Sequence, residues 1–471
     1  METTQNYKQS TIVALLLAGT FIAILNQTLM ITAIPPIMEE MNITANSAQW
    51  LTTVFMLVNG IMIPVSAFLL ERFTTRQLFI SAMSVFVLGT LVAGLAPNFE
   101  MLLMGRVIQS SGAGVMLPLM QTVFLMIFPV NKRGSAMGLV GLVISFAPAI
   151  GPALSGWVTS HYSWRVLFFI ILPIAIIDII VAFFALKNVT ETAKTKVDVL
   201  SIILSSFGFG GLLYGFTCAG NQGWTAATTL LWLTVGVISL LFFITRQLRL
   251  TQPMLEFRVF ANSIFPLTVI IGMITFMGLI GAETIIPLFM QNMRDFTAFE
   301  AGLALLPGAL ITGLLSPITG RLFDKFGARW LAFTGLMIIT GSSFAFASLS
   351  PSTSFTFITV MYGVRMLGLA MVMMPVATAG LNRLPKRLIP HGAAMDNTMK
   401  MIAASVGTAI LVTVMTTTAE TAVQNPEISY PDMYGANMAF IVVSVLSLIG
   451  LIISFFIKER KKEEETPSEQ N

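Results

Sequence analysis

Residues 67–76 of this chain read AFLLERFTTR, and residues 320–329 read GRLFDKFGAR. The two stretches align without a gap, although the second begins 253 residues after the first. In each stretch an acid, a base and a phenylalanine follow one another, and an arginine closes the stretch. The matching charged residues are Glu71, Arg72 and Arg76 in the first stretch and Asp324, Lys325 and Arg329 in the second. A charged segment that recurs in this way, each time after a long apolar run, predicts a chain built from two related halves.

The composition identifies the solvent of this chain. Of its 471 residues 55% are hydrophobic and only 10% are charged, whereas a soluble domain carries about 25% charged residues. Soluble and disordered proteins are therefore excluded, and lipid remains as the surrounding medium. The net charge of +4 gives no support for a nucleic-acid partner. One cysteine and two histidines offer little material for a metal site, and the absence of a Gly-Lys dipeptide excludes a P-loop. We expect no metal and no cofactor.

Apolar windows long enough to cross a bilayer, which takes about 20 residues, repeat along the whole chain. We read the first window as a retained helix and not as a removed signal peptide, because no cleavage signal follows it. The sequence therefore predicts an all-α membrane protein with fourteen transmembrane helices. The predicted spans are 11–34, 51–70, 78–96, 101–126, 135–159, 166–186, 199–220, 227–245, 264–289, 300–319, 330–348, 355–380, 398–418 and 436–457.

The basic residues predict the orientation, because loops on the cytoplasmic side are enriched in Lys and Arg. With a cytoplasmic N-terminus, 21 of the 26 basic residues fall on the inner side. The outer loops hold only Arg165 and Arg294, and the remaining three, Arg106, Arg365 and Lys400, lie within or at the ends of spans. We therefore expect both termini in the cytoplasm, with residues 459–471 as a charged cytoplasmic tail.

A second repeated feature supports the two halves. Arg106 and Arg365 each lie in a glycine-rich span that ends at a proline. We therefore expect an N-terminal six-helix half at 1–190, two inserted helices with their linkers at 191–262, and a C-terminal six-helix half at 263–458. Internal duplication, with a site at the repeat interface near the middle of the membrane, is typical of secondary transporters.

These motifs resemble those of a known family. The two charged stretches look like the signature loop of the major facilitator superfamily, and Gly105–Pro118 resembles its fourth-helix arginine motif. In the fifth span the spacing of its antiporter motif is matched by Gly138, Gly151, Pro152 and Gly156. With fourteen spans, the chain resembles the fourteen-helix drug:proton antiporters, a family of multidrug efflux transporters linked to antibiotic resistance. The resemblance implies proton-coupled export.

The charged stretches and the fifth span have a mechanical interpretation. An acid at a helix end can bind the N-terminal amides of a neighbouring helix, so both stretches are candidates for a cytoplasmic gate. Plain anchoring by positive charge is the alternative. Small residues in the fifth span let backbones touch, and Pro152 kinks the helix or frees a carbonyl. In the family this packing seals the two halves, although tight packing alone would explain it equally well.

Proton coupling needs a carboxylate whose surroundings change during transport. Only Asp178 and Glu283 lie well inside the predicted spans. The resemblance places Glu283 in a helix that lines the central cavity, with a role in binding the proton or a cationic substrate; a structural hydrogen bond is the alternative. The resemblance places Asp178 in a peripheral helix. A role in proton coupling is the prediction for it, and a polar contact to the inserted helices is the alternative. Arg106 is expected to act in proton relay or helix coupling, and snorkelling to the interface is its alternative.

One position departs from the family. Many members carry an acid in the first span, where this chain has Asn26, which cannot titrate. Because of that departure, we expect Glu283, and not a residue of the first span, to carry the proton. The amide side chains expected to bind substrate are Asn26, Gln27, Asn59 and Gln109. Hydrogen bonding between helices is the alternative role of such residues.

We therefore expect a bacterial inner-membrane transporter, not an enzyme, that exports amphipathic, cationic drugs against proton entry. Residues 1–190 would rock against 263–458 in alternating access, driven by the proton gradient. The expected partners are small-molecule substrates, protons and membrane lipids, and a monomer is expected. Export of an endogenous lipid, peptide or signalling nucleotide is the first alternative. A membrane enzyme or a channel is the second.

Overall fold

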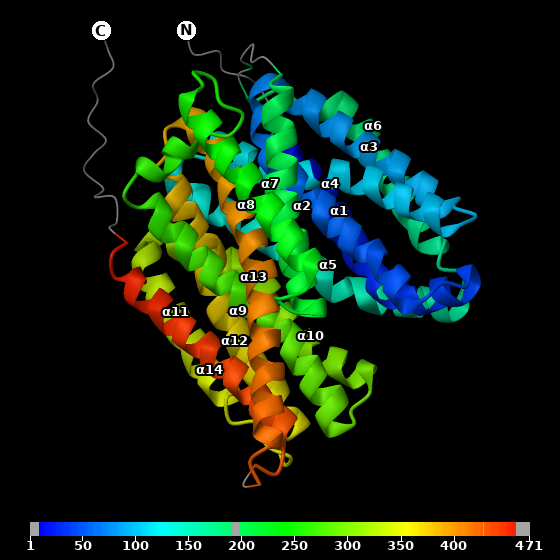
Figure 1. Ribbon diagram of the computed structural model, residues 1–471. Helices are drawn as coiled ribbons and strands as arrows, with labels where there is room; N and C mark the ends of the chain where they lie inside the picture. Colours follow the sequence, from blue (N-terminus) through cyan, green and yellow to red (C-terminus); the bar gives the residue numbers. More distant parts are fainter. Residues whose placement is uncertain (1–8, 191, 193–196, 427, 458–471) are drawn as a thin grey trace.

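A computed structural model describes residues 9–190, 192, 197–426 and 428–457, which form a bundle of long helices (Figure 1). The described residues contain no strand, so the predicted all-α architecture is confirmed. The predicted tail at 459–471 lies outside the described residues, as do Lys8, Lys194, Lys196 and Lys458 among the basic residues used for the topology. The long helices are α1 (Gln9–Met41), α2 (Ala45–Arg72), α3 (Thr75–Gly94), α4 (Phe99–Ile127), α5 (Arg133–His161), α6 (Val166–Ala185), α7 (Val199–Gln222), α8 (Ala227–Arg249), α9 (Phe265–Arg294), α10 (Ala298–Phe326), α11 (Ala328–Phe346), α12 (Phe355–Leu381), α13 (Ile389–Val423) and α14 (Pro431–Ser454). The short 3₁₀ turns are η1 (Val130–Lys132), η2 (Phe257–Ala261) and η3 (Lys386–Leu388).

Each predicted span corresponds to one of these helices. By length and composition 13 helices of the described chain can cross a membrane. The remaining one, α11, carries Arg329 in its first turn and several Ser and Thr residues, which lower its mean hydropathy, and it packs between α12 and α14. The largest difference from the prediction is α13, which begins at Ile389 and not at residue 398. Its first turns hold polar residues, so an apolar window does not detect them.

The helices pack in two groups, with the inserted pair along their seam. Helices α1–α6 contact one another and supply most of the largest buried apolar cluster, and α9–α14 supply the second. The groups meet where α5 packs on α10 and α12, and where α13 packs on α2 and α4. Helix α7 packs on α8, α2 and α13, so it lies across the seam between the groups (Figure 1).

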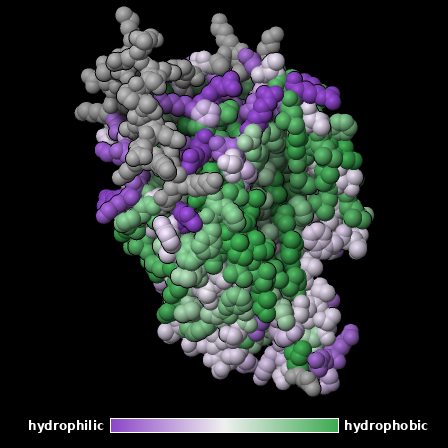
Figure 2. Space-filling model, turned by 90° about the vertical axis from the view of Figure 1, so that its left-hand side faces the viewer, coloured by the Kyte–Doolittle hydropathy of each residue, from purple (hydrophilic) through white to green (hydrophobic). Residues whose placement is uncertain are grey.

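The two ends of the bundle differ in character. We call the basic end the one at which α2 and α10 finish and α5 and α13 begin. Its loops and helix ends carry Arg76, Lys132, Arg133, Arg383 and Lys386. Figure 2 shows a hydrophobic band between this hydrophilic end and the more weakly polar opposite end. The band is the surface expected for lipid contact.

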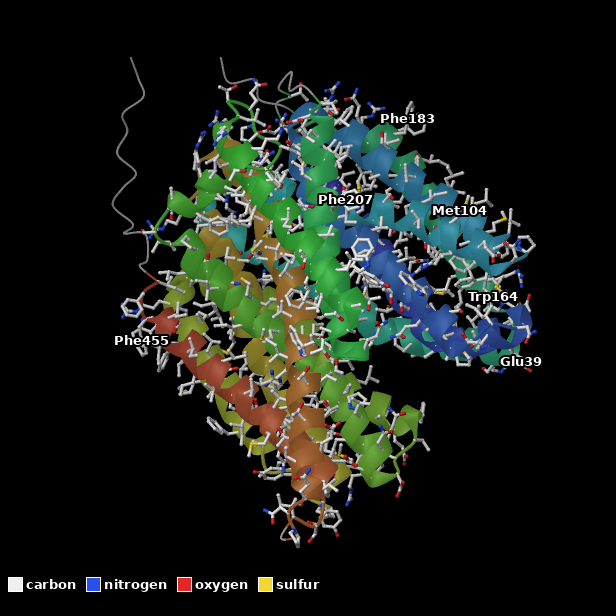
Figure 3. The ribbon with its side chains drawn as sticks, viewed as in Figure 1. Glu39, Met104, Trp164, Phe183, Phe207 and Phe455 are labelled. Atoms are coloured by element: carbon white, nitrogen blue, oxygen red, sulfur yellow. The ribbon has the colours of Figure 1, made fainter. Side chains whose placement is uncertain are left out.

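A charged cluster ties three connections together at the opposite end. Trp164 Nε1 donates to Glu40 Oε2 at 2.7 Å, and Arg165 pairs with the same carboxylate. Arg165 Nη2 also donates to the Ala96 carbonyl at 2.9 Å. The hydrogen bond from Arg165 holds the pKa of Glu40 below its usual range. Figure 3 shows the neighbouring Glu39 together with Trp164 at this end of the first group.

Candidate functional site

The arginine of α4 lies in the interior of the first group. Arg106 is fully buried, and its Nη1 donates to Asn26 Oδ1 at 2.6 Å and to Gln109 Oε1 at 2.7 Å. Its Nε donates to the Leu51 carbonyl at 3.2 Å, and its guanidinium lies 4.2 Å from the centre of the Phe55 ring. Arg106 therefore does not snorkel. The structure brings Asn26 and Gln109 together on Arg106, in place of the carboxylate that a buried guanidinium usually has.

The matching arginine of the second group makes similar contacts. Arg365 of α12 is buried; its Nη2 donates to the Gly278 carbonyl of α9 at 2.8 Å, and its Nη1 donates to the Ser343 hydroxyl of α11. In both groups the arginine of the fourth helix thus reaches the first helix, which agrees with the predicted repeat. The charge of Arg365 also acts on Glu283 of α9.

Glu283 lies deep in a membrane-spanning helix and yet has an exposed side chain. Its neighbours Ala282 and Ile285 are fully buried, and the carboxylate interacts electrostatically with Arg365 and Tyr362. The side chain is nevertheless exposed, and no residue of the described chain donates a hydrogen bond to it. Charged and polar groups of the protein are thus close enough to act on this carboxylate electrostatically, although none of them covers it. Glu283 is therefore placed to exchange a proton or to meet a cation, and the alternative of a structural hydrogen bond has no support here.

Asp178 lies elsewhere. Its side chain is 6% exposed, and within the described chain its Oδ2 has no hydrogen-bond partner. A Cβ added at Gly19 of α1 would lie 2.9 Å from that oxygen, and Met116 and Phe79 would contact the same position. Asp178 thus faces α1 inside the first group. The alternative that it contacts the inserted helices is wrong, because α6 packs on α1, α3 and α5.

The other two amides stand apart from the Arg106 cluster. Gln27 and Asn59 are both half-buried, and no hydrogen bond joins them to Arg106 among the described residues. Asn59 of α2 lies beside Gly114 of α4, where an added Cβ would come 2.9 Å from its Oδ1. The four predicted amides therefore do not form one cluster.

At the basic end, Asp324 joins the two groups of helices. Its carboxylate accepts hydrogen bonds from the Gly134 N–H at 2.7 Å, the Ser135 N–H at 2.8 Å and the Ser135 hydroxyl at 2.5 Å. These donors form the N-terminus of α5, where the helix dipole favours a negative charge. Nearby, Arg133 Nη1 donates to Asn382 Oδ1 at 2.8 Å. The acid of the second charged stretch thus binds helix amides of the opposite group.

Glu71, the matching acid, also reaches the other group but has a different partner. Its Oε1 lies 2.8 Å from Nε2 of His391 in the first turn of α13. His391 is 3% exposed, and its Nδ1 accepts the Glu256 N–H at 3.3 Å. An accepting Nδ1 fixes the tautomer, so Nε2 carries the proton and its N–H donates a hydrogen bond to Glu71. We call this hydrogen bond and the Asp324 contacts the two latches.

The bases of the charged stretches behave differently from the acids. Arg76 donates to the Phe183 carbonyl, and its N–H donates to Asn188 Oδ1 at 3.2 Å, both within the first group. The Arg72 guanidinium lies 5.9 Å from the centre of the Phe68 ring. Lys325 and Arg329 are exposed. The cross-links that the structure shows for these stretches are therefore made by the acids.

Glycines allow close contact of α5 with α10 at the same end. A Cβ added at Gly138 would lie 2.5 Å from the Ser316 carbonyl oxygen, and one added at Gly320 would lie 2.2 Å from the Gly134 carbonyl oxygen. Real Cβ atoms do not approach backbone so closely, so only glycine permits this packing.

The rest of the fifth-helix motif has other surroundings. Gly151 packs against Thr28 of α1, where an added Cβ would lie 2.1 Å from the hydroxyl. Pro152 lies within α5, and its carbonyl accepts the Thr32 hydroxyl at 3.4 Å. Gly156 was expected to allow a backbone contact, and this expectation is wrong: nothing lies within 4 Å of an added Cβ. The tight seal between the groups thus includes Gly138 but not Gly156.

The sequence missed a buried ion pair. Asp396 and Lys400 of α13 are 2% and 4% exposed, and Lys400 Nζ lies 2.6 Å from Asp396 Oδ2. Asn397 Nδ2 donates to Gln121 Oε1 of α4 at 2.6 Å and so joins the groups. The prediction that Asp178 and Glu283 are the only acids well inside the spans is therefore wrong, because it began this helix at residue 398. The i, i+4 spacing of Asp396 and Lys400 is the sequence signal that indicates the ion pair.

These features define a polytopic helical membrane protein with charged groups buried in both halves of its bundle and polar latches between them. Residues 16–408 match the family model described as Major Facilitator Superfamily. The chain belongs to this superfamily.

Bacterial relatives agree with this membership. The chain is 57% identical over 464 residues to the MFS-type transporter YcnB of Bacillus subtilis, covering 98% of this chain and 97% of YcnB. It is 42% identical to the lincomycin resistance protein LmrB of Bacillus subtilis, covering 97% of each chain. It is 30% identical to the multidrug export protein EmrB of Haemophilus influenzae, covering 83% of this chain and 78% of EmrB. The resemblance to multidrug efflux transporters of this superfamily is therefore confirmed.

A solved structure shows the same fold. The crystal structure of the human organic anion transporter MFSD10 (TETRAN) superposes with a TM-score of 0.69 at 12% identity, covering 94% of this chain and 99% of that one. At this identity the likeness concerns the fold alone.

Proposed function

We propose that this protein exports amphipathic, cationic drugs across the bacterial cytoplasmic membrane in exchange for protons. Membership of the superfamily supports a transporter, and the names of LmrB and EmrB support drugs as the substrate class. The proton gradient supplies the energy without a cofactor, since one charge crossing 100 mV is worth about 2.3 kcal/mol.

Alternating access between residues 1–190 and 263–458 is the proposed movement. The latches and the Gly138 contact hold the groups together at the basic end, whereas Gly156 of α5 and Gly302 of α10 have nothing within 4 Å at the other. If the basic end is cytoplasmic, as the positive-inside rule favours, this arrangement faces outward. The opposite state requires both latches to break.

Glu283 is the proposed site of proton exchange, and its position carries the proposal. The side chain is exposed, lies deep in α9 and interacts with Arg365. Rocking of the two groups would change how far this carboxylate is buried beside Arg365, and burial changes its affinity for a proton. A drug cation arriving at the carboxylate would displace that proton. Arg106 and Asp178 are proposed to contribute to coupling within the first group.

Substrate binding near the middle of the membrane completes the proposal. Gln27 and Asn59 are the half-buried amides available for a drug, whereas Asn26 and Gln109 hold Arg106 in this state. Binding of drug would have to compete with those bonds.

Expression in a bacterium that lacks its own drug pumps tests this function. Cells would be challenged with a panel of toxic cations, with lincomycin and with neutral and anionic compounds, each with and without a protonophore. We expect resistance and efflux that the protonophore abolishes and that Glu283→Gln removes. The matched control is Glu420→Gln, an exposed acid at the end of α13. Efflux that survives the protonophore, or no efflux of any compound, would overturn the proposal.

A further inference from the structure

The segment between α8 and α9, residues 250–264, is built into the protein interior. We call it the connector. Leu255 is fully buried, and Met254, Glu256 and Val259 are 4%, 5% and 1% exposed. Phe257 of the connector packs edge-on against Phe243 of α8, with ring centres 5.8 Å apart. A connection of this kind is usually a surface loop, so its burial needs a reason.

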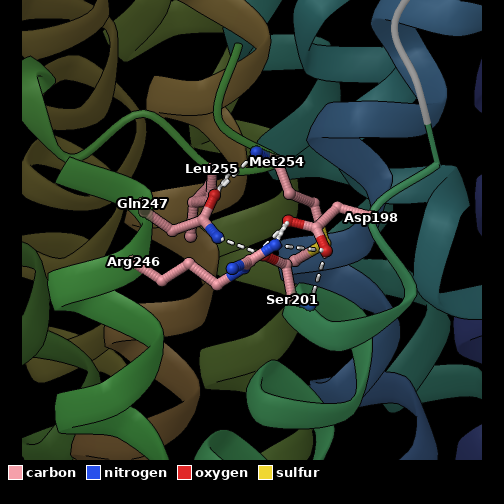
Figure 4. A network of polar contacts seen from close by, with 6 residues as sticks. All are labelled: Asp198, Ser201, Arg246, Gln247, Met254 and Leu255. Carbon is pink, nitrogen blue, oxygen red and sulfur yellow. Dashed lines mark hydrogen bonds and ion pairs between the residues drawn. The ribbon is translucent and has the colours of Figure 1, made fainter. Parts of the chain in front are cut away.

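A side chain of α8 holds the connector by its backbone. Gln247 is 1% exposed, and its Oε1 accepts the Met254 N–H at 2.7 Å and the Leu255 N–H at 3.3 Å. Its Nε2 donates to the Ser201 hydroxyl of α7 at 2.6 Å (Figure 4). The amide therefore joins both inserted helices to the connector, and every polar atom of it is used.

An ion pair fixes the two inserted helices at the same place. Arg246 donates to Asp198 with Nε at 3.0 Å and Nη2 at 3.1 Å, and Ser201 donates to Asp198 at 2.7 Å (Figure 4). Burial raises the pKa of Asp198, but the hydrogen bonds from Ser201 and Arg246 outweigh it and leave the pKa below its usual range. The ends of α7 and α8 thus form one rigid anchor for the connector.

The next residue of the connector touches a latch. The Glu256 N–H donates to His391 Nδ1, and His391 Nε2 donates to Glu71. Without the Glu256 N–H, His391 could place its proton on Nδ1 and leave Nε2 as an acceptor facing a carboxylate. The connector therefore holds His391 by its second ring nitrogen and favours the same tautomer that Glu71 requires. In addition, α7 packs on α2 and α13, the two helices that this latch joins.

We propose that the inserted pair α7–α8 positions the His391–Glu71 latch through the connector. Gln247 and the Glu256 backbone are the positioning groups, and they hold His391 in the orientation and tautomer that close the basic end. The inserted helices thereby favour the state closed at this end. The inference rests on the proposed alternating access.

The test compares two substitutions of one residue. Glu256→Pro removes the donating N–H, and the backbone at Glu256, with φ −86°, lies close to the proline range. Glu256→Ala keeps the N–H and removes the side chain. Spin labels are placed at Gly156→Cys and Gly302→Cys, where space is open, after replacement of the buried Cys218 by alanine. Double electron–electron resonance in lipid nanodiscs then measures the distance between the labels.

A short distance between the labels marks molecules that are closed at the end opposite the basic end. We expect Glu256→Pro to raise this population by roughly fivefold or more, which is the lower range of conformational coupling. Glu256→Ala should leave it unchanged. Gln247→Ala should act like Glu256→Pro, with Arg249→Ala, an exposed change on the same helix, as its control. If the proline variant fails to insert, this second pair decides. Asp324→Asn, which weakens the other latch, tests the movement itself. A shift with Asp324→Asn but none with Glu256→Pro or Gln247→Ala overturns the positioning role alone, whereas no shift with any variant overturns alternating access.

Discussion

Asp324→Asn is the substitution for which the structure gives the clearest energetic expectation. The carboxylate accepts three hydrogen bonds from the first turn of α5. Hydrogen bonds to a charged group contribute about 1.5–3 kcal/mol each, and neutral ones about 1 kcal/mol. An asparagine keeps one acceptor oxygen, but its NH₂ group faces backbone donors. The negative charge at a helix N-terminus is lost as well, at roughly 0.5–1 kcal/mol.

Together these losses weaken the state closed at the basic end by about 3 kcal/mol. Because 1.4 kcal/mol is tenfold in an equilibrium constant, the ratio of closed to open molecules should fall about 100-fold. Drug export should fall with it, since a pump held open at one end cannot complete its cycle.

Alkylation of a buried reporter measures this ratio. Ser316 of α10 is 2% exposed and lies against Gly138 in the closed seam, so Ser316→Cys reacts only when the seam opens. In inside-out vesicles, a charged maleimide should react about 100-fold faster when Asp324→Asn is added, provided that closing is faster than labelling. Glu300→Gln, at the other end of α10, is the control. An unchanged labelling rate with Asp324→Asn would refute the role of this latch.

Substitutions at three further places, the α5 seam, the buried ion pair of α13 and the Glu40 cluster, have defined expectations. Gly138→Val should weaken the closed seam by about 1–3 kcal/mol through overpacking and reduce drug efflux, whereas Gly341→Ala in α11, an exposed glycine with open space around it, should leave efflux unchanged. Asp396→Asn and Lys400→Met should each destabilise the protein by about 3–5 kcal/mol because each leaves a buried charge unpaired, while the double variant should recover most of the loss in thermal unfolding in detergent. Glu40 has a lowered pKa in the folded protein, so its stabilising contribution is present above about pH 4.5 and is lost as the pH falls through the lowered pKa. In thermal unfolding, Glu40→Gln should therefore lose less stability in that acid range than the unmodified protein. An identical pH profile for the two proteins would contradict the assignment.

The helices and one latch could be predicted from the sequence because their causes are local. Apolar windows identify spans wherever the solvent is lipid, and the gapless repeat identified the two acids. The preference of a carboxylate for helix N-terminal amides predicted the kind of partner that Asp324 has. It did not predict which helix would supply the amides.

Contacts between distant segments could not be predicted from one sequence. His391 lies 320 residues from Glu71, and its role depends on a backbone N–H of the connector, which carries no side-chain signature. The start of α13 was missed because Asp396 and Lys400 neutralise each other there, so the helix tolerates charge that an apolar window rejects. The openness around Gly156 is a property of the conformation, which the spacing of glycines does not encode.

Proton exchange at Glu283 is the central claim, and transport in proteoliposomes tests it most directly. With purified protein and a fluorescent drug cation that the cell assay identifies as a substrate, we expect an imposed pH gradient to drive uphill accumulation by the unmodified protein and by Glu420→Gln. Glu283→Gln should abolish this accumulation while drug still exchanges for drug across the membrane without a gradient, because that exchange needs no change in protonation. Uphill accumulation by Glu283→Gln at the unmodified rate would contradict the claim.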